Sequence, residues 1–156
     1  GGFIVGARSG WGLTSCRTAD GWSPAAFHRL SGINFGFLAG LEKLNVVLVF
    51  TDRSAIDVLS SGKFQLGAGL NVTVGPVGRG LGAGTDYKLD SPVYSYARGK
   101  GLYAAASLEG SSIEPVSKYN RALYGKMTSR EILTASDKYI VKDVESFIAA
   151  LKEYAP

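Results

Sequence analysis

Tyrosines alternate with basic residues in one short stretch of the sequence. Tyr94, Tyr96 and Arg98 occupy every second position, and Gly99-Lys100 follows as a pair suited to a type II′ turn. A hairpin folded there would place Tyr103 opposite Tyr96, so that the three tyrosines and Arg98 line one side. Such a surface could lie against a membrane interface or stack nucleobases. Tyrosines that only pack at a sheet edge are the structural alternative.

A glycine-rich run follows the pattern expected of a tight loop: Gly75-Pro76-Val77-Gly78-Arg79-Gly80-Leu81-Gly82-Ala83-Gly84. It lacks the Lys-Ser/Thr ending of a P-loop, and no convincing helix follows to present its N-terminus to a phosphate. A loop or a series of tight bends is therefore favoured over a nucleotide site. Arg79, at the centre of the run, is a candidate contact for an anionic head group.

The side chains needed for catalysis or metal binding are scarce. His28 is the only histidine and Cys16 the only cysteine, and neither lies in a catalytic or metal-binding motif. An enzyme would need a pocket that gathers Glu109 with Arg98 or Asp86, and no calcium-loop pattern occurs. We therefore expect a protein without enzymatic activity, cofactor or metal.

The overall composition favours one folded domain, spanning residues 1–156. Apolar residues make up 46% of the chain and charged residues 19%, which fits a globular protein rather than a disordered one. The net charge is +4, but no run of three basic residues occurs, so nucleic acid is not an expected partner. The longest apolar run, Val46-Val47-Leu48-Val49-Phe50, is too short to cross a membrane.

Strands and turns are expected in the first two thirds of the chain, because 20 of its 21 glycines lie in residues 1–110. Ser9-Gly10 and Asp20-Gly21 are turn signals, and the first predicts a hairpin between residues 3–8 and 11–17. Further strands are expected at residues 26–37, 44–50, 70–74, 93–98 and 101–108. The strand at 44–50 is apolar on both faces, which predicts a central, buried position.

Short helices are expected at three places. A capping pattern predicts one at residues 54–61, with a glycine as its stop signal. Residues 117–124, closed by Gly125, predict a second. Thr128 and Glu131 have the spacing of a capping box at the start of a third.

The last helix is expected within residues 137–154. It carries an apolar stripe that should pack on the sheet, although a membrane surface would suit the same pattern. The stripe consists of Ile140, Val144, Phe147, Ile148 and Leu151. The predicted fold class is α+β, with a glycine-rich, mainly antiparallel sheet or barrel-like core, short helices and a C-terminal amphipathic helix.

Several segments follow one another in an order that matches a known family. The most specific is Tyr94-Ser95-Tyr96-Ala97-Arg98-Gly99-Lys100-Gly101-Leu102-Tyr103-Ala104, continuing to Ser107-Leu108-Glu109-Gly110. The others are Gly2-Phe3-Ile4-Val5-Gly6-Ala7-Arg8 with Gly10 and Gly12, Asp20-Gly21-Trp22-Ser23-Pro24-Ala25, Phe35-Gly36 with Gly40, Lys63-Phe64-Gln65-Leu66-Gly67, Val74-Gly75-Pro76-Val77-Gly78-Arg79, Asn120-Arg121-Ala122-Leu123-Tyr124-Gly125 and Ile132-Leu133. Together they resemble the SYLF domain family, a lipid-binding and actin-regulating domain of eukaryotes with many bacterial relatives.

The resemblance implies a non-enzymatic domain that binds phospholipid. The expected partners are anionic phospholipids or a membrane surface, and the candidate lipid-binding residues are Arg79, Tyr94, Tyr96, Arg98, Lys100 and Tyr103. A structural or protein-interaction module without direct lipid binding is the alternative. The family pattern begins with a helical segment upstream of residue 1, and in eukaryotic members that segment is implicated in membrane contact.

The resemblance also carries an expectation about location. The tail at residues 137–156 and the stretch Ser15-Cys16-Arg17-Thr18 are more similar to bacterial members, which are commonly exported. We therefore expect a periplasmic or envelope-associated protein, lipoprotein-like, whose signal segment is not part of this chain. An actin role is less expected for such a member.

Overall fold

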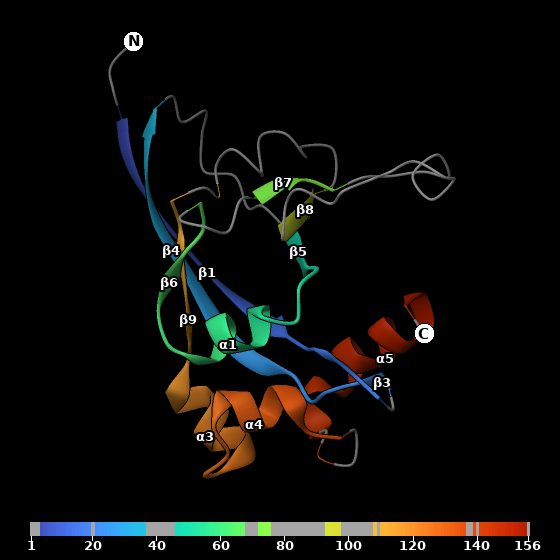
Figure 1. Cartoon of the computed structure of the whole chain (residues 1–156). Helices are drawn as coiled ribbons and strands as arrows, with labels where there is room; N and C mark the ends of the chain where they lie inside the picture. The colour runs from blue at the N-terminus through green and yellow to red at the C-terminus, as the bar shows by residue number, and fades with distance from the viewer. Residues whose placement is uncertain are drawn as a thin grey trace, which may run out of the picture. The chain divides into compact units, whose positions relative to one another are not determined.

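The chain has a mixed α+β fold in which short helices accompany sheets (Figure 1). The structure is a computed structural model. It describes residues 4–19, 21–36, 46–67, 72–75, 93–97, 108, 110–136, 139 and 141–155; for residues 4–9, 33–36, 74 and 97 it describes the backbone alone. The predicted fold class is confirmed for the α+β arrangement, the short helices and the C-terminal helix.

The longest strands are β1 (Ile4–Thr14) and β4 (Ala26–Gly36), which are neighbours in a four-stranded sheet. Its order is β1-β4-β9-β6, where β9 is Ser112–Pro115 and β6 is Phe64–Gln65. The hairpin predicted around Ser9-Gly10 is wrong, because β1 runs through both residues without a turn. Gly10 has no positive φ and lies within the strand.

A hairpin is present at the second turn signal, although Asp20 lies outside the described residues. Strands β2 (Arg17–Thr18) and β3 (Gly21–Trp22) form a small antiparallel hairpin in which Thr18 pairs with Gly21. Gly21 has a φ of 136°, a backbone conformation that residues with a Cβ atom rarely adopt. This explains the glycine at that position.

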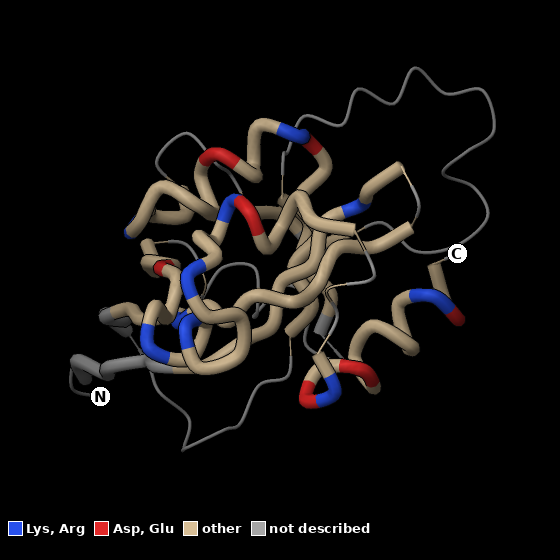
Figure 2. The backbone as a smooth tube through the Cα atoms, turned by 90° about the horizontal axis from the view of Figure 1, so that it is seen from below, with Lys and Arg blue, Asp and Glu red and all other residues tan. Residues whose placement is uncertain are grey.

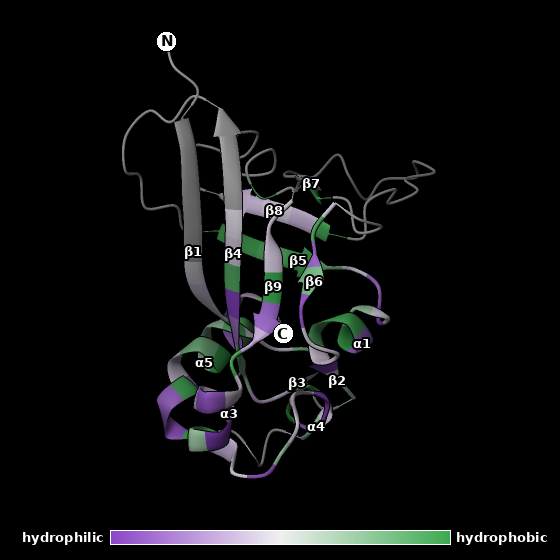
Figure 3. Ribbon diagram, turned by 90° about the vertical axis from the view of Figure 1, so that its left-hand side faces the viewer, coloured by the Kyte–Doolittle hydropathy of each residue, from purple (hydrophilic) through white to green (hydrophobic). Residues whose placement is uncertain are grey.

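The remaining strands form a separate sheet with the order β5-β8-β7. β5 (Val46–Phe50) runs antiparallel to β8 (Val93–Ala97), and β7 (Val72–Val74) runs parallel to it. The prediction that the apolar strand at 44–50 is central and buried is wrong: among the described strands of this sheet β8 has the central place, and Val47 of β5 is 61% exposed. Figure 3 shows β5 as a hydrophobic strand, so its apolar composition did not indicate its position.

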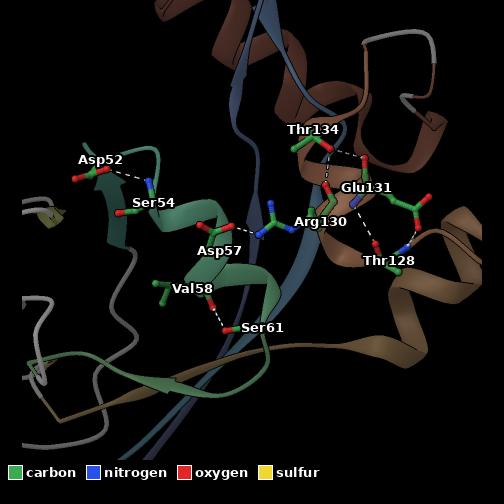
Figure 4. Close-up of polar contacts among 9 residues, drawn as sticks. All are labelled: Asp52, Ser54, Asp57, Val58, Ser61, Thr128, Arg130, Glu131 and Thr134. Carbon is green, nitrogen blue, oxygen red and sulfur yellow. Dashed lines mark hydrogen bonds and ion pairs between the residues drawn. The ribbon is translucent and has the colours of Figure 1, made fainter.

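The predicted short helices are all present. α1 is Ala55–Ser60, α3 is Ser117–Tyr124 with Gly125 at its C-terminal end, and α4 is Ser129–Thr134. The capping box of α4 is formed on both sides: Glu131 N donates to Thr128 Oγ1, and Thr128 N donates to Glu131 Oε1, each at 3.1 Å (Figure 4). The local signals sufficed here because a cap and its partner lie within one helical turn.

Helices α1 and α4 are linked by an ion pair between Asp57 and Arg130, which face each other in Figure 4. Both side chains are more than half exposed, so the pair adds little stability. Just before α1 in the chain, Asp52 accepts a hydrogen bond from the backbone N of Ser54 at 2.9 Å.

The C-terminal helix packs its apolar stripe inward, as predicted. A 3₁₀ turn, η3 (Lys142–Val144), leads into α5 (Glu145–Tyr154). The core residues Val144 and Ile148 are buried against Ala25, with further partly buried neighbours. These neighbours are Leu13, Leu123, Val141, Phe147 and Leu151. The described residues of the stripe therefore pack in the protein core. The remaining member, Ile140, lies outside the described residues.

The contacts divide the chain into two compact units. Unit 1 comprises Gly1–Arg8, Ser31–Ala55 and Gln65–Ser112, and unit 2 comprises the remaining segments, Ser9–Leu30, Ile56–Phe64 and Ile113–Pro156. Strands β1 and β4 contribute residues to both units, and the single domain stays a prediction.

Candidate lipid-binding surface

Two of the six predicted lipid-binding residues fall within the described part of the chain. Tyr94 and Tyr96 lie on β8. The other four, Arg79, Arg98, Lys100 and Tyr103, lie outside it, as does the predicted hairpin turn at Gly99-Lys100. The pairing of Tyr96 with Tyr103 therefore stays a prediction, and the observed neighbours of β8 are β5 and β7.

The two tyrosines share one face of their sheet. Tyr94 lies opposite Val49, and Tyr96 lies opposite Val47, across the antiparallel pair of β5 and β8. Thr73 of β7 also pairs with Tyr94. Because directly paired residues point to the same side, these five residues form one surface, here called the β8 tyrosine face.

Exposure within this face is uneven. Val47 is 61% exposed and Val49 is 42% exposed, whereas Tyr94 is only 8% exposed. The opposite face carries Val72, Val93 and Ser95, all buried. The face that bears the tyrosines therefore presents its valines to the outside and holds Tyr94 against the protein.

Tyr96 is held by a glycine. The ring of Tyr96 lies where a β-carbon on Gly75 would be, and the backbone N of Gly75 donates to Ser95 O at 2.8 Å. Any side chain at position 75 would collide with the ring. Tyr96 therefore has a packing role at the end of β7, and its role toward lipid stays a prediction.

A second aromatic surface lies in unit 2. Trp11 of β1 and Tyr119 of α3 have ring centroids 5.2 Å apart, and Tyr119 meets Phe27 of β4 edge-on at 5.6 Å. The guanidinium carbon of Arg29 lies 5.7 Å from the centroid of the Trp11 ring, within cation–π range. These four residues are called the Trp11 cluster below.

The Trp11 cluster is open to the outside. Trp11 is 59% exposed and Tyr119 is 42% exposed, and Arg29 is also exposed. Sequence reasoning missed this cluster because its members come from three segments that no local pattern connects. The one available signal was a tryptophan in a strand between two glycines, Gly10 and Gly12.

Helix α3 is fixed to β4 by a buried asparagine. Phe27 N donates to Asn120 Oδ1 at 2.7 Å, and Asn120 Nδ2 donates to Phe27 O at 3.3 Å, so the side-chain amide pairs with the strand as another strand would. Tyr124 OH donates to Ala25 O at 2.5 Å, and burial raises the pKa of Tyr124 to about 12. This docking sets the position of Tyr119 beside Trp11.

The loop before β4 is also tied down by polar contacts. Ser23 Oγ accepts from Cys16 N at 2.9 Å, and Ser15 Oγ donates to Ser23 O at 2.7 Å. Trp22 Nε1 donates to Ala155 O at 2.9 Å, under the guanidinium of Arg17. The second tryptophan thus joins the β2–β3 hairpin to the end of α5.

The only histidine is structural. His28 is buried, and its Nε2 donates to the carbonyl O of Leu59 at 2.9 Å, which ties β4 to α1. Burial lowers the pKa of His28 below its ordinary value of 6.5, so the ring is neutral at pH 7. Among the described residues no three His, Cys, Asp or Glu side chains lie close enough to hold a metal ion.

Comparison with known proteins shows which family the chain belongs to. The profile of the Ysc84 family, described as "Las17-binding protein actin regulator", matches residues 31–154. The chain belongs to the Ysc84 family. This is the SYLF family that the motifs resembled, and it is non-catalytic, which agrees with the expectation of a protein without enzymatic activity.

Curated members of the Ysc84 family are similar over most of this chain. The human SH3 domain-containing YSC84-like protein 1 is 35% identical over 125 residues, which are 79% of this chain and 36% of that protein. Protein YSC84 of Saccharomyces cerevisiae is 33% identical over 142 residues, 88% of this chain and 30% of that protein. The chain thus spans about a third of the length of these relatives. No solved structure matches it.

Proposed function

We propose that this Ysc84-family chain binds the surface of anionic phospholipid membranes without catalysing a reaction. The observation that carries the proposal is the β8 tyrosine face, where exposed Val47 and Val49 lie beside Tyr94 and Tyr96. Val47 and Val49 are neighbours on one face of β5, and contiguous exposed apolar patches, unlike single exposed residues, mark surfaces that meet a partner or a membrane.

The basic residues that the proposal needs follow this face in the chain. β8 ends at Ala97, and Arg98 comes next, with Lys100 two residues later. Arg79 lies four residues after Gly75, which follows the end of β7. Cations near an anionic bilayer contribute about 1 kcal/mol each, so three of them would give weak, salt-sensitive binding. Among the described residues no helix is both long and apolar enough to cross a bilayer.

Vesicle flotation tests this function. The chain is mixed with phosphatidylcholine vesicles, with and without phosphatidylserine, at low and high salt. We expect flotation with the anionic vesicles that weakens as salt rises. Arg98→Ala and Lys100→Ala should each reduce the affinity about fivefold, whereas Lys142→Ala, a matched exposed cation on η3, should leave it unchanged. Absence of flotation with every vesicle would refute the proposal.

A protein-interaction module is the second candidate. The family description names Las17 binding and actin regulation, and the exposed valines of the β8 tyrosine face would suit a protein partner equally well. Binding to a protein would persist without vesicles and would depend on Val47 rather than on salt. Loss of partner capture in Val47→Asp, with vesicle flotation absent in the unmodified chain, would favour this candidate.

The periplasmic or envelope-associated location is part of the same proposal. It rests on the likeness of residues 15–18 and 137–156 to bacterial members. Fractionation of the source cells, followed by detection of the chain with an antibody, tests it. Recovery in the soluble cytosolic fraction alone would refute this location.

A further inference from the structure

We propose that the Trp11 cluster is a second membrane contact, in which Trp11 and Tyr119 enter the interfacial layer of an anionic bilayer and Arg29 binds lipid phosphate. The inference rests on the proposed function, but it uses unit 2 and none of the residues predicted from the sequence. It follows from the exposure, the stacking and the charge of the described residues.

Exposure is the first argument. Trp11, the aromatic residue at the centre of the cluster, is 59% exposed, although an indole ring buries more apolar area than almost any other side chain. Gly10 and Gly12 flank it and contribute no side chain, and β1 is at the edge of its sheet among the strands that the structure describes. Indole and phenol rings combine an apolar body with a polar tip, which suits the boundary between acyl chains and head groups.

The stacking order is the second argument. Phe27 contacts Tyr119 edge-on, and Tyr119 in turn contacts Trp11. These contacts fix the positions of the rings before any membrane is bound. The guanidinium of Arg29 lies over the ring of Trp11, within cation–π range, and the side chain is itself exposed. A guanidinium can remain stacked on an aromatic ring while its N–H groups donate to a phosphate, which a lysine ammonium does less well.

Charge is the third argument, and it selects an anionic surface as the partner. The three segments that build the cluster, residues 9–14, 26–30 and 117–124, contain Arg29, Lys118 and Arg121 and no Asp or Glu. The next strand of the sheet, β9, carries one acidic residue, Glu114. Helix α5 differs: near the label C in Figure 2 it carries both basic and acidic residues, although its Tyr154 is 82% exposed. Exposed aromatic rings thus occur on both helices, but only α3 combines them with cations alone.

Tryptophan fluorescence provides a direct test, because the chain has two tryptophans with different environments. Trp22→Phe leaves Trp11 as the only emitter, and Trp11→Phe leaves Trp22, which is hydrogen-bonded to Ala155, as the matched control. Each variant is titrated with phosphatidylserine-containing vesicles and with vesicles of lipids brominated on the acyl chains. We expect a blue shift and quenching for Trp11 and neither for Trp22.

Affinity measurements by flotation extend the test. Trp11→Ala should weaken vesicle binding about tenfold and Arg29→Ala about fivefold. Tyr154→Ala, an exposed aromatic on the helix of mixed charge, should leave binding unchanged. Circular dichroism melts of each variant exclude a general loss of folding, because an exposed side chain should contribute little to stability.

Two results would overturn the inference, and only one of them would also overturn the proposed function. If the unmodified chain does not float with any vesicle, the proposed function and this inference both fall. If it floats while Trp11 is neither shifted nor quenched, the inference alone falls, and lipid contact belongs to the β8 tyrosine face. In that second case the Trp11 cluster would be left for a protein partner.

Discussion

The β8 tyrosine face in unit 1 and the Trp11 cluster in unit 2 are both aromatic surfaces, but they were found in opposite ways. The first was predicted from a continuous motif, and the structure holds Tyr94 inside and packs Tyr96 on Gly75. The second is invisible in the sequence, and the structure exposes Trp11 and stacks Arg29 on it. A motif can therefore mark residues that build a sheet, while an exposed surface is assembled from residues that no motif joins.

The largest effect should come from Gly75→Ala in unit 1. The added methyl group would overlap the ring of Tyr96, so the ring must move and the contact between β7 and β8 must loosen. We expect a loss of about 3 kcal/mol in the free energy of unfolding, measured by urea denaturation.

The matched control for that change is Gly12→Ala, because a β-carbon there meets nothing within 4 Å and the residue has no positive φ. It should leave the urea midpoint nearly unchanged. Adding Tyr96→Ala to Gly75→Ala should cost much less than the sum of the two single changes. An equal midpoint for Gly75→Ala and the unmodified chain would contradict the packing of Tyr96 on Gly75.

A smaller effect is expected from Asn120→Ala in unit 2. The change removes the printed partner of Phe27 N at a buried site, whereas Phe27 O keeps the hydrogen bond from Val116 N, and a buried donor left without a partner is costly. We expect a loss of about 2 kcal/mol in thermal or urea unfolding. The emission of Trp11 in the Trp22→Phe background should also change, because Tyr119 loses its fixed position on α3.

Lys118→Ala on the same helix is the control for Asn120→Ala, since its side chain is exposed and should alter stability little. If Asn120→Ala lowers stability without any change in Trp11 emission, the docking of α3 does not position the Trp11 cluster. The environment of Trp11 would then not depend on the hydrogen bonds between Asn120 and β4.

The smallest effect is a pH dependence that also belongs to unit 2. Because burial lowers the pKa of His28 in the folded protein, its ring is neutral in both states above pH 6.5. Below that value the unfolded chain binds a proton that the folded chain resists, so the free energy of unfolding should fall as the pH is lowered.

Urea unfolding over a pH series from about 5 to 8 measures this dependence, since histidine is the side chain that titrates there. His28→Gln should flatten it, because no other histidine is present. A stability that rises on acidification through this range would contradict the assigned burial of His28.

Much of the local structure could be predicted from the sequence, and the reason is that its signals are short-range. Thr128 and Glu131 cap α4 within one turn, Gly125 ends α3, and Gly21 begins β3 directly after the turn of the β2–β3 hairpin. The apolar stripe that contains Val144 and Ile148 gave the buried side of the last helix correctly, because its spacing alone defines one face. The ordered motifs likewise gave the Ysc84 family.

What the sequence could not determine depends on partners distant in the chain. Ser9-Gly10 looked like a turn, but β1 continues through both residues beside β4. The apolar strand β5 looked central, but among the described strands of its sheet β8 has that place. Asn120 joins Phe27 across 93 positions, and Trp11 meets Arg29 and Tyr119 from three separate segments. Ladder hydrogen bonds and burial are settled by the whole set of neighbours, so only the tertiary structure decided which aromatic residues are packed and which are exposed.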